Sequence, residues 1–242
     1  HLDAVMSLAI EMGLPPLWAV AMVTLNTARY FSLPDRGAVA PGCRADLALL
    51  SSLDPVRVSH VFKDGRHVVD KGELAIDIPD AALPADVSSM NVRPYDVTAF
   101  ELPALGKHTL VIDLIPDQIL TGKAVLPAEI KNGRVVQDVQ RDILKLAVIE
   151  RHRGTGNIAV GLVRGFSLRE GALATSVAHD SHNIICVGCA DADMATAARA
   201  VEEMKGGLAI ACDRRIVTRL PLPIGGLMSD RPLAETAGLW ED

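Results

Sequence analysis

The order of apolar and polar positions near the start of the chain predicts two helices. Apolar residues recur at helical spacing over 5–12, and we expect Asp3 before them as the N-cap and Gly13 after them as the stop. Pro15-Pro16 then predicts the start of a second helix over 17–31, because proline fits the first helical turn.

A small β unit is expected after these helices. The run at 45–50 predicts a short buried strand, and the segment 58–69, broken by Asp64-Gly65, predicts a β-hairpin. Residues 77–94 contain prolines and show no hydrophobic period, which is typical of a linker between domains.

Strands dominate beyond this linker. Residues 168–177 are interpreted as a short helix, and a longer helix is expected with Asp191 as its N-cap and Gly206-Gly207 as its stop. The predicted strands are 108–116, 118–126, 129–137, 142–152, 157–166 and 183–188, followed by a hairpin over 208–223. Strands interleaved with helices indicate an α/β or α+β fold.

Composition and charge narrow the function classes. With 49% hydrophobic residues, the 242-residue chain can bury a core, so disorder is not expected. A net charge of −6 and an aromatic content of 3% argue against a nucleic-acid partner. We find neither an apolar run long enough to span a membrane nor a signal peptide, and we expect a cytoplasmic protein without a membrane partner. Since the chain starts without methionine, it is expected to be a piece of a longer protein.

The cysteines are interpreted as reduced core residues. Cys43, Cys186, Cys189 and Cys212 all lie on apolar segments. Cys186 and Cys189 match C-x-x-C, but the run around them reads as a strand, in which positions three apart face opposite sides. A redox pair would instead sit at a helix N-terminus, so core packing is the favoured interpretation.

The densest polar cluster is His179-Asp180-Ser181-His182-Asn183, which comes directly before an apolar strand. Imidazole and carboxylate groups are ligands of zinc, manganese and iron. The same groups, with the amide of Asn183, could hydrogen-bond a polar heterocycle. They could also satisfy the backbone of the loop itself. The residues alone leave these three roles open.

Other catalytic signatures are weak or absent from the sequence. It contains no H-x-H, no H-E-x-x-H, no dinucleotide fingerprint and no nucleophile elbow. Arg169-Glu170 could act as an acid–base unit or could be a solvated pair. The other histidines, which are expected to be isolated surface or core residues, are His60, His67, His108 and His152.

Two stretches resemble known families. Residues 165–188 with the HDSHN pentad, the following helix with its Gly-Gly stop, and residues 220–229 ("LPLPIGGLMS") resemble the C-terminal domain of the bacterial adenine deaminase family. Residues 1–50, with Thr24, Asn26 and Ala28 and then the G-A-x-A-P-G-x-x-A-D pattern, resemble the end of an amidohydrolase barrel.

The resemblance implies a domain layout. Residues 1–35 would be the last helices of a (β/α)8 barrel, and 36–76 would be a segment of a small β-sandwich domain. The linker 77–94 would then lead into a separate mixed α/β C-terminal domain at 95–242.

The resemblance also implies a chemistry, the hydrolytic deamination of adenine to hypoxanthine and ammonia in purine salvage. The binuclear Mn²⁺ or Fe²⁺ centre would be bound by the rest of the barrel, upstream of His1, so no metal or catalytic residue is assigned to this chain and the isolated piece is expected to be inactive. His179 to Asn183, together with Glu170, are the candidates for contacting the substrate or covering the active site. A homo-oligomer is expected.

Two alternatives to this function remain. The first is another cyclic-amide or purine amidohydrolase, which would share residues 1–75 but not HDSHN. The second is a structural or dimerisation fragment, in which the apolar stripe on 194–204 packs against a second subunit.

Overall fold

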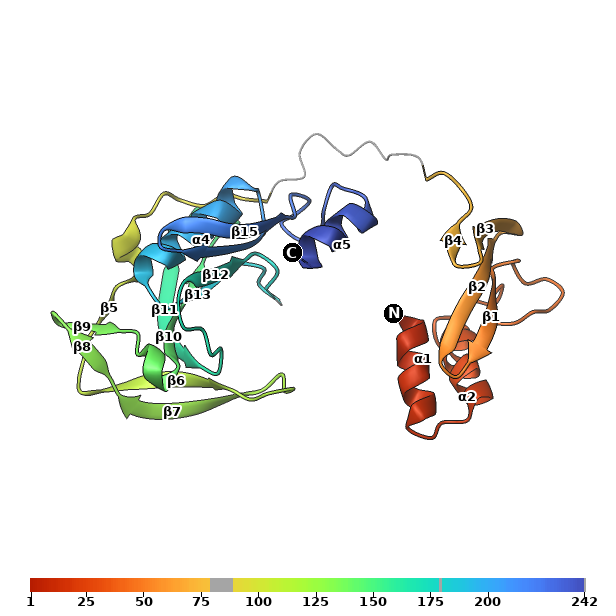
Figure 1. Cartoon of the computed structure of the whole chain (residues 1–242), viewed down its shortest axis with the longest axis horizontal. Coiled ribbons are helices and arrows are strands. Elements are labelled where there is room, and N and C mark those ends of the chain that lie inside the picture. The colour runs from red at the N-terminus through yellow and green to blue at the C-terminus, as the bar shows by residue number, and fades with distance from the viewer. Residues whose placement is uncertain (79–88, 179, 242) are drawn as a thin grey trace. The chain divides into compact units, whose positions relative to one another are not determined.

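The computed structural model of the chain describes residues 1–78, 89–178 and 180–241. The chain divides into two compact units, His1–Ala81 (unit 1) and Ala82–Asp242 (unit 2), which are described separately (Figure 1). Among the described helices, none has both the length and the apolar character needed to cross a bilayer.

Unit 1 begins with the two predicted helical segments. They are α1 (Leu2–Glu11), then α2 (Pro16–Ala21), which continues through a π-helical turn (Met22–Asn26) into α3 (Thr27–Tyr30). The prediction that Asp3 caps α1 is wrong: the N-cap is His1, without a side-chain bond, and Asp3 lies inside the first turn. An acidic residue there still favours the positive end of the helix dipole.

The predicted hairpin of unit 1 is confirmed, within a four-stranded sheet. Its strands, in sheet order, are β1 (Leu47–Leu53), β2 (Val56–Lys63), β3 (Arg66–Asp70) and β4 (Glu73–Leu74). Asp64 and Gly65 both have positive φ, as a two-residue hairpin turn requires. The predicted burial of 45–50 is wrong for unit 1 by itself, because Leu49 and Leu50 are 46% and 36% exposed.

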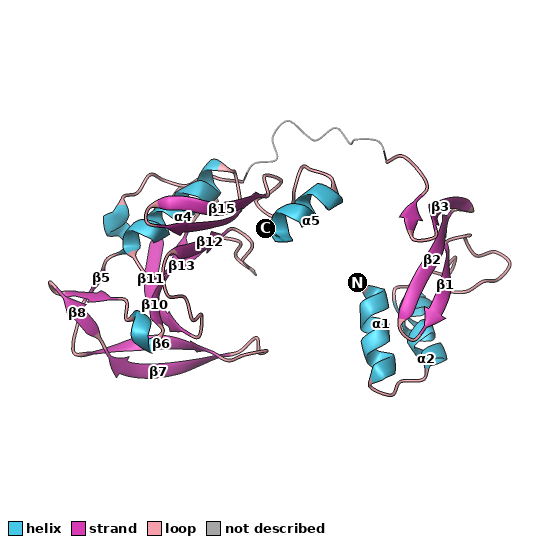
Figure 2. Cartoon of the chain, viewed as in Figure 1, coloured by secondary structure: helices cyan, strands magenta, loops and turns pink. Residues whose placement is uncertain are grey.

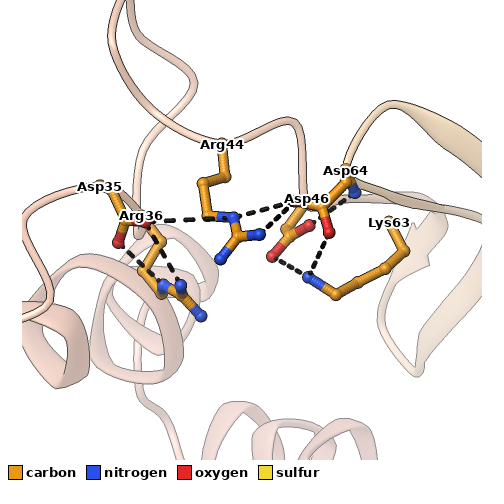
Figure 3. Close-up of polar contacts among 6 residues, drawn as sticks. All are labelled: Asp35, Arg36, Arg44, Asp46, Lys63 and Asp64. Atoms are coloured by element: carbon orange, nitrogen blue, oxygen red, sulfur yellow. Dashed lines mark hydrogen bonds and ion pairs between the residues drawn. The ribbon is translucent and has the colours of Figure 1, made fainter.

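Alternating charges join the loop after α3 to this hairpin (Figure 3). Arg44 lies 2.7 Å from a carboxylate oxygen of Asp64, and Lys63 lies 2.7 Å from Asp46. Asp46 also accepts the backbone N–H of Asp64 at 2.8 Å. The bond from Lys63 holds the pKa of Asp46 below its usual range, so the carboxylate stays charged and fixes the hairpin turn.

Unit 2 is built mainly from strands (Figure 2). Its large sheet has eight strands in the order β15-β14-β12-β13-β10-β11-β6-β7. The strands are β6 (His108–Leu114), β7 (Thr121–Pro127), β10 (Ile143–Ile149), β11 (Ile158–Arg164), β12 (Ala172–Thr175), β13 (Ile184–Gly188), β14 (Gly207–Cys212) and β15 (Arg215–Pro221). Only β11 and β6 run parallel among these described strands, so unit 2 is α+β rather than doubly wound α/β.

Smaller elements surround this sheet. They are the 3₁₀ turns η2 (Val97–Phe100) and η3 (Val139–Arg141), the three-stranded sheet of β5 (Leu102–Pro103), β9 (Arg134–Val136) and β8 (Glu129–Lys131), and the C-terminal helix α5 (Leu233–Glu241).

Helix α4 (Asp191–Glu203) covers one face of the large sheet, over β12 to β15 (Figure 1). Its apolar stripe, including Met194, Ala198 and Val201, is buried in the unit's own core. This stripe is therefore not free to bind a second subunit, as the dimerisation alternative required.

The predicted N-cap of α4 is wrong. The N-cap is Ala190, and the Asp191 carboxylate instead accepts bonds from Lys145 Nζ at 2.7 Å and from Gln137 Nε2 at 2.8 Å. Lys145 is 1% exposed, and a buried ammonium group needs such a partner. The ion pair fixes the start of α4 on β10.

The predicted helix at 168–177 is also wrong, since residues 172–175 form β12. This strand lies between β13 and β14 and is buried, so tertiary pairing overrides the helix propensity of its alanines and leucine. Gly171 precedes it with φ +71°, and a Cβ there would lie 2.5 Å from the Ala211 carbonyl oxygen.

Gly207 provides a test of the backbone packing between β14 and β15. It has φ +127°, and a Cβ at this position would lie 1.9 Å from the Leu220 carbonyl oxygen. Gly207→Ala should destabilise unit 2 by about 3 kcal/mol or more, measured as a shift in the urea midpoint followed by circular dichroism. The control is Gly161→Ala in β11, where a Cβ meets nothing within 4 Å, and a change below about 1 kcal/mol is expected. Equal effects of the two substitutions would contradict this account.

Candidate functional site

The HDSHN pentad lies in the loop that joins β12 to β13. These strands pair as a hairpin, with Thr175 opposite Ile185 near the loop. The backbone of Asp180 and His182 is left-handed, at φ +66° and +47°, and the His182 N–H donates to the Ala178 carbonyl at 2.9 Å. Left-handed backbone at a residue other than glycine is uncommon and often occurs at functional sites. His179 lies outside the described residues.

Two polar atoms of this loop are buried without a partner among the described groups. They are Nδ1 of His182 and Oδ1 of Asn183. An unsatisfied buried polar atom costs about 1–3 kcal/mol, so native proteins keep few of them. Ser181 is exposed, and its carbonyl accepts a bond from His152 Nε2 at 2.9 Å.

Arg151 anchors the loop, although the sequence analysis did not select it. Its guanidinium group donates to the carbonyl of His182, to the carbonyl of Ser89 at 3.1 Å and to the carbonyl of Gly225 at 3.0 Å. The residue is 1% exposed, and burial lowers the pKa of its side chain. A signal was available, because Arg151 continues the alternation of the buried residues Ala147 and Ile149.

Ser176 provides a second anchor between the loop and the segment 222–228. Its hydroxyl group is buried, donates to the Gly226 carbonyl at 2.6 Å and accepts the Gly207 N–H at 2.8 Å. Gly226 has φ +74°, and a Cβ there would lie 2.9 Å from the Arg151 guanidinium group. The fold thus brings together the two motifs singled out in the sequence, HDSHN and the Gly-Gly turn of 220–229.

Glu170 is not part of this constellation. It is exposed and lies before β12, whereas the HDSHN loop follows the other end of that strand. Its neighbours include Cys189 and Cys212, and burial, followed by nearby carboxylates that include Glu170, raises the pKa of both thiols. The proposed acid–base role of Arg169-Glu170 has no support from this placement.

The prediction that the cysteines are core residues holds for Cys186, whereas Cys43, Cys189 and Cys212 are half-buried. Cys186 is buried beneath α4, and Cys189 packs with Val187 in a different cluster. The two therefore face opposite sides of the sheet, as predicted for a strand. All four cysteines of the chain are free, and burial strongly raises the pKa of Cys186, which keeps it a thiol.

The described residues of the HDSHN loop, 180–183, assemble no metal-ligand set. Of the described His, Cys, Asp and Glu side chains, only His60, His67 and Asp70 gather as a group of three. The prediction that His60 and His67 are isolated is therefore wrong, because their ring nitrogens lie 3.3 Å apart. Asp180 and His182 belong to no such group, and the unpartnered atoms described on this loop are the hydrogen-bonding atoms of His182 and Asn183.

The turn beside Arg151 is held by the Glu150 carboxylate. It accepts backbone N–H groups from His152 at 2.5 Å, from Arg153 at 2.7 Å and from Thr155 at 3.0 Å. Hydrogen bonds from Thr155 and Arg153 are the largest causes that lower the pKa of Glu150 to about 2.

The low pKa of Glu150 makes its contribution to the stability of unit 2 depend on pH. Because its folded-state pKa lies below the unfolded value, the stabilisation is fully present above pH 4.5 and is lost as the pH falls towards about 2. Glu150→Gln should lower the urea midpoint at pH 7, and the difference from the unmodified protein should narrow between pH 4.5 and 2. The control is Glu129→Gln, whose carboxylate has a 3.9 Å ion pair with Lys131. A difference that stays constant across this pH range would refute the assignment.

Removing the guanidinium group of Arg151 should loosen the HDSHN loop. Arg151→Met would leave several buried carbonyl groups without a donor and should destabilise unit 2 by about 3–5 kcal/mol. Hydrogen exchange should show lost protection at the amides of His182 and Gly207, and urea unfolding should show a lower midpoint. Arg153→Met is the matched control, since Arg153 is exposed two residues away. Unchanged exchange at His182 would show that Arg151 does not anchor the loop.

Known proteins match both parts of the chain. Residues 118–242 match the sequence model of the adenine deaminase C-terminal domain, and residues 2–68 match that of the amidohydrolase family. An adenine deaminase of Oleidesulfovibrio alaskensis is 44% identical over 99% of this chain, and one of Desulfatibacillum aliphaticivorans is 46% identical over 97%. A third, from Dehalococcoides mccartyi, is 39% identical over 100% of the chain. The chain spans 41–42% of the length of these relatives.

The family match covers the large sheet from β7 onward, the HDSHN loop, Arg151 and the segment around Gly226. Apart from Ser89, the residues described for the candidate site thus lie within the part of the chain that matches this family. The chain belongs to the adenine deaminase C-terminal domain family.

Proposed function

We propose that the complete protein hydrolyses adenine to hypoxanthine and ammonia, and that this chain supplies its C-terminal part. The observation that carries the proposal is the pair of buried, unpartnered atoms on His182 and Asn183, within a domain of the adenine deaminase family. The names of the relatives support the same substrate. We assign the residues 178–183 to a loop that covers the active site of the whole enzyme.

The two unpartnered atoms match one edge of adenine. Adenine presents an N6 amine as a donor and N7 as an acceptor on this edge. Asn183 Oδ1 can accept a bond from the amine, and His182 Nδ1, in the tautomer that carries its proton there, can donate to N7. The loop would thus position the purine, while the closed site excludes bulk water.

The proposed Mn²⁺ or Fe²⁺ centre belongs to the rest of the enzyme. Such a centre supplies an activated water, because a bound metal lowers the pKa of its water. Asp180 and His182 join no three-ligand group among the described side chains. Their proposed role is therefore to contact the substrate.

The layout of unit 1 supports a place for this chain in a larger enzyme. We assign residues 1–35 to the last helices of a (β/α)8 barrel, 36–76 to a small β-sandwich domain and 95–242 to the separate C-terminal domain. Leu17, Trp18 and Tyr30 are 75%, 67% and 82% exposed on the helices of unit 1. Large apolar side chains exposed this way are typical of a surface that another part of a protein covers.

The proposal extends to the oligomeric state, cellular location and metabolic role of the enzyme. We infer a homo-oligomer in the cytoplasm, acting in purine salvage. The balance of acidic and basic residues, with a net charge of −6, supports a small-molecule substrate rather than a nucleic-acid partner.

His182 provides the test of this function in the complete enzyme. His182→Ala should lower kcat/KM for adenine about 100-fold, which corresponds to one lost contact of about 2.7 kcal/mol. The metal content should stay unchanged, because the loop is not proposed to bind the metal. The matched control is His108→Ala at the exposed start of β6, which should leave kcat/KM unaltered.

Wild-type kinetics in His182→Ala would remove the loop from the active site. A substrate screen addresses the alternative enzyme class: turnover of a different purine or cyclic amide, with none of adenine, would replace adenine deamination. A complete enzyme without any turnover would favour a structural role for this domain.

A further inference from the structure

Three potential metal ligands meet on the hairpin of unit 1, far in sequence from the HDSHN loop. His60 lies on β2, and His67 and Asp70 lie on β3 (Figure 1). Their ligand atoms all lie within 4.8 Å of one another. The adenine-binding role proposed above uses none of these residues.

An irregularity in the strand pairing makes this meeting possible. Positions 67 and 70 would face opposite sides of a regular strand, because side chains alternate. The register shifts between Val61 and Phe62, which pair with Val69 and His67 and so leave residue 68 as an extra position. A bulge of this kind re-aims the side chains beside it, so His67 and Asp70 share the face of His60.

The distances fit a single ion. His60 Nδ1 lies 3.3 Å from His67 Nε2 and 3.2 Å from a carboxylate oxygen of Asp70. Tetrahedral ligands at about 2.0–2.1 Å from Zn²⁺ are about 3.3–3.4 Å apart, since the edge of a tetrahedron is about 1.63 times its centre-to-corner distance. Two of the three separations thus already match a zinc site.

Hydrogen bonds between the three side chains satisfy their ligand atoms less completely than a bound divalent cation would. A neutral imidazole has one N–H, so Nδ1 of His60 can donate to His67 or to Asp70 but cannot donate fully to both. A divalent cation accepts electron pairs from all three atoms at once.

The site is held in place and is reachable from solvent. The ring of His67 stacks on Phe62 with centroids 4.7 Å apart and planes at 19°. The side chains of His60 and Asp70 are 30% and 52% exposed, so a hydrated ion can approach them. The paired strands β2 and β3 carry all three ligands and hold their backbones in place before the ion arrives, which lowers the ordering cost of binding.

We propose that His60, His67 and Asp70 form a binding site for a divalent transition-metal ion of the zinc class. Two imidazoles and one carboxylate are ligands that Zn²⁺ accepts, and three protein ligands leave the fourth position open to water. The ion would join β2 to β3 across the hairpin.

Zinc titration of the full 242-residue chain tests the site. The chain is first treated with a chelator and dialysed, and Zn²⁺ is then added in a calorimeter. We expect His67→Asn to weaken this binding at least about 100-fold, since even loss of an outer partner of a ligand costs 10–100-fold. Asp70→Asn should weaken it as well. His108→Asn is the matched control and should bind as the unmodified chain does.

The imidazole signals in an NMR spectrum provide a second readout that needs no variant. Added Zn²⁺ should shift the ring signals of His60 and His67 and leave those of His108 in place. Circular dichroism checks that each variant keeps its fold. The proposal is overturned if the unmodified chain does not bind Zn²⁺ at micromolar concentrations, if His67→Asn binds it equally well, or if only other histidines shift.

Discussion

Arg151 places a positive charge in the interior of unit 2, where three segments of the chain hydrogen-bond to it. Its guanidinium group binds carbonyl oxygens of Ser89, His182 and Gly225, which are far apart in the sequence. A buried charge is stable only when polar groups surround it closely, so these segments cannot move apart independently. The shape of the candidate site therefore depends on one side chain that does not itself need to touch a substrate.

The strand that precedes Arg151, β10, brings a second cation into the core. Lys145 on β10 is as buried as Arg151, but its partner is the Asp191 carboxylate at the start of α4. One cation thus fixes the helix that covers the sheet, and the other fixes the loops at the sheet's end. The glycines at 207 and 226 allow this packing, because a Cβ at either position would collide with its neighbours.

The chain holds two groups of histidines with different chemistry. In the HDSHN loop, His182 and Asn183 present buried hydrogen-bonding atoms and no metal-ligand set among the described residues. On the hairpin, His60 and His67 converge with Asp70 near the open surface. Residue type alone does not separate the two cases, because histidine serves as donor, acceptor and metal ligand. Burial and the distances between ligand atoms do.

Local patterns in the chain were enough to locate most individual elements. Periodicity and turn residues located the helices of unit 1, the hairpin at Asp64-Gly65 and most strands of unit 2. The HDSHN pentad also stood out, because five polar residues before a buried strand are unusual. Each of these features depends on residues close together in the sequence, so a local pattern is enough to predict it.

Features that depend on contacts between distant residues could not be predicted from these local patterns. Residues 172–175 became a strand because two neighbouring strands pair with them, and Asp191 became an ion-pair partner rather than a cap because Lys145 lies beneath it. The meeting of His60 with His67 and Asp70 required a shift of strand register that no propensity encodes. The alternation of β10 could have indicated that Arg151 is buried, but not which groups surround it. The free energy of a buried charge is set by those groups, and the chain brings them together only when it folds.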